Sequence, residues 1–180
     1  MNKLDSGIDY FYKQEYVKAL SCFLEVLSQG ADVSVNNYNV ALAYDAMGEF
    51  DLAIAFYKKA ISLNSSDIRS MNNLALICFK INEENAALAW LDKAIEINPY
   101  DAEAYSQMGT YYKEKSDFKM AENYYNKAKN LDNKFFYNYY NLALLYLQMN
   151  DKVKAKENFE LCLSINPDFN LAIEELKKLQ

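Results

Sequence analysis

The sequence repeats itself every 34 residues, and this period is the strongest constraint on its fold. Small residues recur at one position, where Ala41 is followed by Ala75, Gly109 and Ala143, each 34 residues after the last. A second column of small residues keeps the same step: Ala19, Ala53, Ala87, Ala121 and Ala155. A period in this range is typical of proteins built from stacked copies of one structural unit. We therefore expect an array of five units.

Large residues keep the same register as the small ones. One column of mainly aromatic residues contains Tyr10, Tyr44, Cys78, Tyr112 and Tyr146. A second contains Phe23, Tyr57, Leu91, Tyr125 and Phe159. Two helices that cross at about 8–10 Å accept only small side chains at the contact. The small columns therefore predict the helix crossings, and the large columns predict the side chains that fill the remaining space.

Turn residues divide each unit into halves. The midpoint of the units is occupied by Gln14, Gly48, Asn82, Ser116 and Asn150. Gly and Asn tolerate the left-handed backbone conformation that ends a helix. Pairs such as Asn98-Pro99 and Asn166-Pro167 close the units, and a proline there cannot continue the preceding helix. Each unit is thus predicted to be two helices of about 14 residues, each about 21 Å long.

These residues identify a family resemblance. Asn141-Leu142-Ala143 followed by Tyr146 in a first helix, with alanines on both sides of Tyr57 in a second, resembles the tetratricopeptide repeat. The resemblance covers residues 1–169 and is strongest from residue 34 onward. It implies an all-α fold, a right-handed α-α superhelix in which the first helix of each unit lines a concave groove.

We predict a single domain, residues 1–180, with repeats at 1–33, 34–67, 68–101, 102–135 and 136–169. The first repeat is degenerate, because Lys3 and Ser6 stand where large residues are expected. Residues 169–180 are predicted to form a capping helix with apolar residues along one side and charges along the other, as the end of a repeat array requires. This cap favours a free-standing protein over a slice of a longer array.

Composition excludes several classes of function. The net charge of −6 disfavours nucleic acid, whose phosphates are neutralised by Lys and Arg. The sequence has no histidine, the commonest general base and metal ligand, and its three cysteines lack metal-binding spacing. No apolar run approaches the roughly 18 residues of a membrane span, and the N-terminus does not resemble a secretory signal. We expect a cytoplasmic protein without catalysis, cofactor, metal or membrane insertion.

The first helices keep a second stripe of side chains that packing within a unit does not need. We predict that this stripe binds a partner in the groove. The candidate partner-binding residues are Tyr38, Asn39, Leu42, Arg69, Asn73, Leu76, Phe79, Gln107, Lys113, Tyr137, Tyr140, Asn141 and Leu144. Their spacings of three and four residues place them on one helical face.

One column of this stripe is amide-rich: Asn39, Asn73, Gln107 and Asn141. A carboxamide offers a donor and an acceptor, as a peptide backbone does. In related repeat proteins such a column binds the backbone of an extended ligand, so the resemblance implies an amide ladder here. Four such rungs contribute about 4 kcal/mol, which corresponds to only millimolar affinity. The apolar neighbours must supply the rest, so the predicted partner is a protein or peptide with apolar side chains.

Two alternatives remain open for the groove. The carboxylate clamp of this family requires a Lys and, four residues later, an Asn, but the matching pairs are Leu4 with Ile8 and Tyr38 with Leu42. The clamp is therefore not expected. Self-assembly is the second alternative, in which the groove accepts a helix of a neighbouring copy, such as residues 170–180, in a head-to-tail contact.

Overall fold

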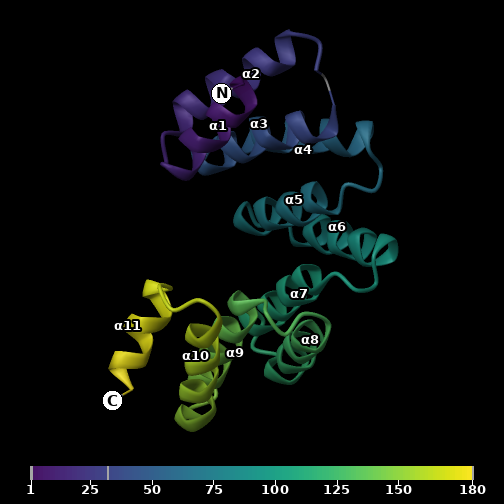
Figure 1. Cartoon of the computed structure of the whole chain (residues 1–180). Coiled ribbons are helices and arrows are strands. Elements are labelled where there is room, and N and C mark those ends of the chain that lie inside the picture. Colours follow the sequence, from purple (N-terminus) through teal and green to yellow (C-terminus); the bar gives the residue numbers. More distant parts are fainter. Residues whose placement is uncertain (1, 32, 180) are drawn as a thin grey trace. The chain divides into compact units, whose positions relative to one another are not determined.

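The computed structural model describes residues 2–31 and 33–179. Eleven α-helices, and no strands, occur within these residues (Figure 1). The chain divides into two compact units, Met1–Ile97 and Asn98–Gln180. The predicted all-α fold of five helical hairpins and a C-terminal helix is confirmed in this part of the chain.

Unit 1 contains three hairpins. Its helices are α1 (Lys3–Tyr12), α2 (Tyr16–Ser28), α3 (Ser34–Ala46), α4 (Phe50–Leu63), α5 (Ile68–Lys80) and α6 (Glu84–Ile97). Each helix packs against the next one along the chain, so the hairpins stack on one another. Because consecutive helices are the ones in contact, local sequence order determines most of the packing within the unit.

Unit 2 contains two hairpins and the terminal helix. Its helices are α7 (Ala102–Glu114), α8 (Phe118–Leu131), α9 (Phe136–Gln148), α10 (Lys152–Ile165) and α11 (Asn170–Lys178). Sequential helices pack together here as well, and α7 also contacts α9. The core of this unit joins Ala121 and Tyr125 of α8, Leu142 of α9, Phe159 of α10 and Ala172 of α11.

The turn inside each hairpin uses a left-handed residue at the predicted midpoint. Gly48 has φ 80°, and the four equivalent residues, which are not glycines, have φ 60–63°. These are Gln14, Asn82, Ser116 and Asn150. The next residue donates its N–H back to the helix, as in Glu49 N to Tyr44 O at 2.9 Å and Asp117 N to Tyr112 O at 2.9 Å. This bond closes the helix in a Schellman motif, in which the helix ends at a left-handed residue.

The small columns lie at helix crossings, as the period predicts. Gly109 of α7 faces the ring of Tyr125 on α8, and a Cβ placed on Gly109 would lie 2.6 Å from Tyr125 Cδ1. Gly7 faces Phe23 in the same way, with a Cβ 2.5 Å from Phe23 Cε1. A large residue of the second helix therefore fills the space that the small residue of the first leaves open.

The degenerate first repeat has a physical reason. Val40 and Ala43 of α3 are buried with Ala19 and Phe23 of the preceding helix, α2. The residues 34 positions earlier, Ser6 and Asp9, are polar, and neither is buried. Lys3 instead forms an ion pair with Glu25 at 2.8 Å. The first hairpin therefore carries polar side chains at positions where the second hairpin is apolar and buried.

Candidate functional site

Unit 1 contains a hollow of about 280 Å³ on the face formed by its first helices, α1, α3 and α5. Side chains of all three helices, and one of α2, line it: Ile8, Phe11, Tyr12, Phe23, Tyr38, Asn39, Leu42 and Arg69. Pockets that hold whole small molecules typically span about 300–1,000 Å³. The hollow is therefore suited to individual side chains of a larger partner. We call it the α1–α3–α5 hollow.

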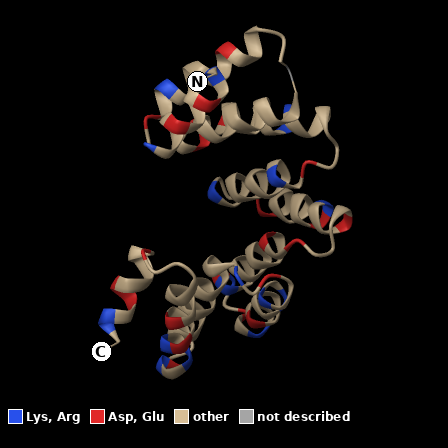
Figure 2. Cartoon of the chain, viewed as in Figure 1, with Lys and Arg blue, Asp and Glu red and all other residues tan. Residues whose placement is uncertain are grey.

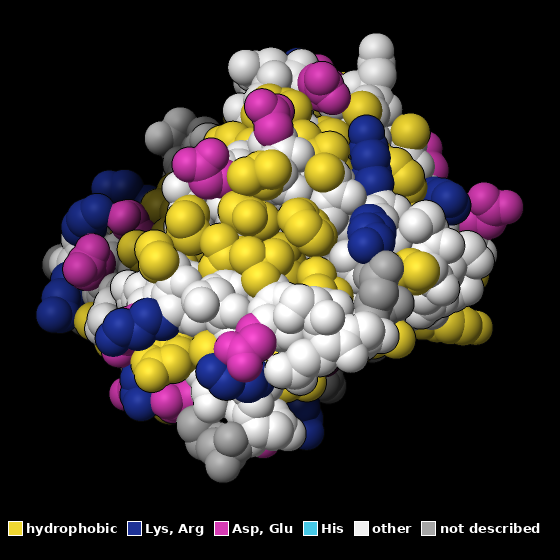
Figure 3. Space-filling view, turned by 90° about the horizontal axis from the view of Figure 1, so that it is seen from above, with side chains coloured by type: hydrophobic (Ala, Val, Ile, Leu, Met, Phe, Trp, Pro, Cys, Tyr) yellow, Lys and Arg dark blue, Asp and Glu magenta, His cyan; other side chains and the backbone are white. Residues whose placement is uncertain are grey.

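The α1–α3–α5 hollow is mainly apolar and aromatic, with one amide and one cation. Ile8 and Leu42 are 34 residues apart, so α1 and α3 present the same repeat position to it. Tyr12 is 82% exposed, which is unusual for a large aromatic residue. Figure 3 shows one face of the molecule, on which hydrophobic side chains gather in a patch with charged side chains at its edge.

Tyr38 organises the α5 side of the hollow. The guanidinium carbon of Arg69 lies 4.7 Å from the centre of the Tyr38 ring. Asn73 Nδ2 donates a hydrogen bond to the Tyr38 hydroxyl at 3.2 Å. The ring of Tyr38 also packs against Tyr57, with centroids 5.9 Å apart. A cation over an aromatic face is held by the ring quadrupole, so these contacts orient Arg69 at the edge of the hollow.

A buried carboxylate lies behind Arg69. Asp67 is 5% exposed and receives hydrogen bonds from the hydroxyls of Ser34 at 2.6 Å and Ser70 at 2.9 Å. It also caps α5 by accepting from the Ser70 N–H at 3.4 Å. Arg69 Nε is 4.0 Å from Asp67 Oδ1, while the Arg69 side chain is 62% exposed. This separation is longer than a hydrogen bond, so Asp67 and Arg69 form only a loose ion pair.

Two further predicted residues, Leu76 and Phe79, also belong to α5. Leu76 is 36% exposed, and Phe79 is half-buried near the end of the helix. Lys80 is joined to Asp45 of α3 by an ion pair of 3.0 Å. This ion pair and the hydrogen bond between Asn73 and Tyr38 connect α3 to α5 at two places along the helices.

In unit 2 the predicted aromatic anchors contact the protein itself. Tyr137 and Tyr140 of α9 each form edge-to-face contacts with Phe169, at 5.2 and 5.1 Å between ring centroids. Phe169 is the residue immediately before α11. Leu144 packs against the same core, together with Leu176 and Leu179. The segment around α11 therefore covers part of the stripe on α9.

The remaining predicted residues have different surroundings. Gln107 is 7% exposed, and its Nε2 donates to Glu103 Oε1 at 3.4 Å. Lys113 is half-buried, and this burial lowers the pKa of its ammonium group. Asn39 and Asn141 are half-buried. The structure thus brings Tyr38, Asn39, Leu42 and Arg69 together at one hollow of unit 1.

Our sequence prediction missed four residues of the hollow, Ile8, Phe11, Tyr12 and Phe23. The predicted partner-binding residues begin at Tyr38 and include none of the first repeat. A signal was available, because Ile8 occupies the same column as Leu42 and Leu76. The repeat register alone could therefore have extended the site to α1.

Two equivalent buried tyrosines differ in their hydrogen bonding. Tyr125 lies 3.0 Å from Thr110 Oγ1, and the two hydroxyls share a hydrogen bond. The equivalent of Thr110 in the second hairpin is Leu42, which has no polar group. The buried hydroxyl of Tyr57 consequently has no hydrogen-bond partner among the described residues. Burial raises the pKa of both phenols.

We expect Tyr57→Phe and Tyr125→Phe to change stability in opposite directions. Removing the unpaired hydroxyl of Tyr57 should raise the free energy of unfolding by about 1 kcal/mol, since a buried polar group without a partner is costly. Removing the paired hydroxyl of Tyr125 should lower it by about 1 kcal/mol. Urea denaturation followed by circular dichroism measures both. If both variants changed the free energy of unfolding in the same direction, the hydroxyls of Tyr57 and Tyr125 would not differ in hydrogen bonding as described.

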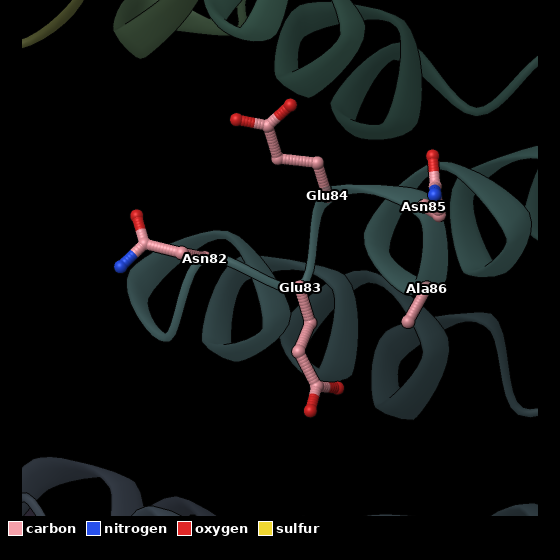
Figure 4. A pocket seen from close by; sticks show the side chains of 5 residues that line it. All are labelled: Asn82, Glu83, Glu84, Asn85 and Ala86. Atoms are coloured by element: carbon pink, nitrogen blue, oxygen red, sulfur yellow. The ribbon is translucent and has the colours of Figure 1, made fainter.

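A second hollow and the buried cysteines lie outside the α1–α3–α5 hollow. A shallow hollow of about 430 Å³ at the turn between α5 and α6 is lined by Asn82, Glu83, Glu84, Asn85 and Ala86. The side chains of Glu83 and Glu84 point in opposite directions (Figure 4). The thiols of Cys22, Cys78 and Cys162 are buried, and burial raises the pKa of the Cys162 thiol to about 11. A thiol with so high a pKa is a poor nucleophile at neutral pH.

Charged side chains of both signs are spread over the surface of each unit (Figure 2). Lys and Arg are interspersed with Asp and Glu within each unit (Figure 2). In residues 2–31 and 33–179, no group of three His, Cys, Asp or Glu side chains is arranged to hold a metal ion. The helices described here are all too short or too polar to cross a membrane.

Comparison with protein families decides the identity of the repeat. Three family models, each described as tetratricopeptide repeat, match residues 37–67, residues 68–101 with 137–169, and residues 90–123. Together they cover most of the chain. The protein belongs to the tetratricopeptide repeat family. Comparison with the curated proteins gave no match.

Solved tetratricopeptide repeat structures share the fold. A thermophilic tetratricopeptide repeat protein of Thermus thermophilus, TTC0263, has a TM-score of 0.86 at 20% identity, covering 99% of this chain and 97% of that chain. MamA has a TM-score of 0.65 at 23% identity, and the match covers 89% of this chain and 94% of the MamA chain. YrrB, described as a tetratricopeptide repeat protein with an unusual peptide-binding site, has a TM-score of 0.59 at 20% identity, covering 97% and 90%. Tetratricopeptide repeats generally mediate interactions with proteins or peptides.

Proposed function

We propose that this protein binds an extended segment of a partner protein in the α1–α3–α5 hollow, without catalysing a reaction. One observation carries the proposal: Tyr38, Asn39, Leu42 and Arg69, predicted as partner contacts, border a single hollow in unit 1. An open apolar hollow with a few polar groups is a common form of binding site.

Apolar side chains of the partner supply most of the affinity in this proposal. Ile8, Phe11 and Leu42 form an apolar surface that a partner's aliphatic or aromatic side chain can cover. Burying one such side chain contributes about 1.5–3 kcal/mol. Two of them, with a few hydrogen bonds, approach the roughly 8 kcal/mol of micromolar affinity.

Amides hold the backbone of the segment in register. Asn39 borders the hollow, and Asn73 lies on the neighbouring first helix, α5. Asn73 Nδ2 donates a hydrogen bond to the Tyr38 hydroxyl. Asn73 Oδ1 is an acceptor, so it can receive a hydrogen bond from a peptide N–H. We restrict the amide ladder at this hollow to these two residues, because Gln107 and Asn141 belong to unit 2. YrrB supports the proposal only in showing that the fold can carry a peptide-binding site.

The packing of α11 weakens the self-assembly alternative. Leu176 and Leu179 pack against the core of unit 2, together with Ala172. A neighbouring copy could receive the apolar face of this helix only after the helix had left its own core.

We propose that the protein is located in the cytoplasm. Its three cysteines are free and buried, which accords with a reducing compartment.

The proposal predicts that Leu42→Ala weakens binding of a partner peptide by about tenfold or more, because it removes apolar contact area from the hollow. The peptides are selected from a random library displayed on phage, and their affinities are measured by fluorescence anisotropy. Asn39→Ala should weaken the same peptides by severalfold, through loss of a backbone bond.

Leu52→Ala is the matched control. Leu52 belongs to α4 in the same unit, is 44% exposed and does not border the hollow. It should leave the affinity unchanged. A loss at Leu52 equal to that at Leu42, or selected peptides that bind both variants like the wild type, would overturn the proposed site.

A further inference from the structure

We infer that the α1–α3–α5 hollow selects segments in which a large apolar residue is followed or preceded, about three residues away, by an Asp or Glu. The inference rests on the proposed function and adds the chemistry of the ligand. It depends on the position and environment of one side chain, Arg69.

Among the described residues that border the hollow, Arg69 is the one cation. Its side chain is 62% exposed, so its guanidinium is accessible from solvent. Stacking over the Tyr38 ring, 4.7 Å away, limits the positions that it can take. An arginine oriented in this way loses less freedom when it binds a carboxylate, and its planar fork matches two carboxylate oxygens.

The carboxylate already near Arg69 does not satisfy it. Asp67 accepts hydrogen bonds from the Ser34 and Ser70 hydroxyls, and its closest oxygen is 4.0 Å from Arg69 Nε. This separation is longer than a hydrogen bond of about 2.7–3.2 Å. The donors of Arg69 that face solvent remain able to bind an external carboxylate.

Geometry gives the spacing within the ligand. The spacing is counted from Leu42, which belongs to α3, to Arg69, which belongs to α5, the next first helix along the chain. Neighbouring packed helices are about 8–10 Å apart, and an extended chain advances about 3.3 Å per residue. The acidic residue should therefore lie about three residues from the apolar one.

The carboxylate belongs to a side chain, not to a chain terminus. Asn73 lies four residues after Arg69 on the same helix, and its Oδ1 can accept from a further peptide N–H. Backbone that is bonded to Asn73 therefore lies beside Arg69, and a side chain of that segment can reach the guanidinium. A terminal carboxylate at Arg69 would leave this amide unused.

The test selects phage-displayed random peptides against the wild type and against Arg69→Glu. Wild-type selections should be enriched in Asp or Glu near an apolar residue, and Arg69→Glu should instead enrich Lys or Arg. For a selected peptide with an amidated C-terminus, replacing its acidic residue by Asn or Gln should weaken binding about tenfold, the value expected for one charge-assisted bond. Arg69→Gln should remove that preference, and Arg69→Lys should retain part of it.

Lys80→Gln is the control, because Lys80 is paired with Asp45 and does not border the hollow. It should leave the preference for acidic peptides intact. Equal affinities for the acidic and amide peptides, or equal losses for both with Arg69→Gln, would overturn this inference and leave the proposed function standing. A preference lost when the C-terminus is amidated would overturn the side-chain assignment. Failure to enrich any peptide would overturn the proposed function, and this inference with it.

Discussion

Phe159→Ala is expected to lower the free energy of unfolding by about 3–5 kcal/mol, the usual loss for a large aromatic residue in a core. Phe159 is 0% exposed, and its ring lies 5.8 Å from that of Tyr140. Its cluster joins α8, α9, α10 and α11. The cavity left by alanine would remove contacts from each of these helices. Urea denaturation and hydrogen exchange of the α9 and α10 amides measure the effect.

Leu161→Ala is the matched control for this change. Leu161 lies two residues further along α10 and is 47% exposed. A substitution of this kind on the surface usually changes stability by less than about 0.5 kcal/mol. Similar losses for the two variants would show that Phe159 does not join the helices of unit 2 as described.

Asp67→Ala is expected to lower the free energy of unfolding by about 2–4 kcal/mol, since it removes two bonds to a charged group and a helix cap. Asp67 is buried and connects the start of α3, through Ser34, to the start of α5, through Ser70. Its loss would leave both serine hydroxyls without this acceptor. Denaturation by urea, followed by circular dichroism, measures the change.

The variant Asp117→Ala measures the contribution of helix capping alone, without the buried hydrogen bonds that Asp67 accepts. Asp117 caps α8 by accepting from the Met120 N–H at 3.1 Å, but it is exposed. Its replacement should cost only about 1 kcal/mol, the ordinary value of a cap. If Asp67→Ala cost no more than Asp117→Ala, the link between the second and third hairpins would contribute nothing beyond capping.

The repeat could be predicted from sequence because the same physical problem recurs in every hairpin. Small residues at helix crossings, illustrated by Gly109 against Tyr125, repeat with the period of the stack. The midpoint turns were also predictable, although Gln14 and Ser116 adopt the left-handed conformation without being residues that favour it. There the bond from the following N–H to the end of the helix stabilises the turn.

The candidate site was predicted only in part. The register correctly grouped Tyr38, Asn39 and Leu42 on one face, and Arg69 joins them at the hollow. It could not show that Tyr140 meets Phe169, because this contact depends on how the segment at the start of α11 packs against α9. Nor could it show that the hydroxyl of Tyr57 lacks a partner, which depends on the position of a neighbouring helix.

The sequence by itself determined the period, the helical hairpins and the face that each first helix turns away from its partner. These follow from spacing, since residues three and four apart share a helical face wherever the helix is placed. Only the tertiary structure decided which parts of that face stay open. The α1–α3–α5 hollow is open to solvent, whereas Tyr140 is half-buried and packs against Phe169. Exposure depends on what packs over a side chain, and periodicity within one helix does not contain that information.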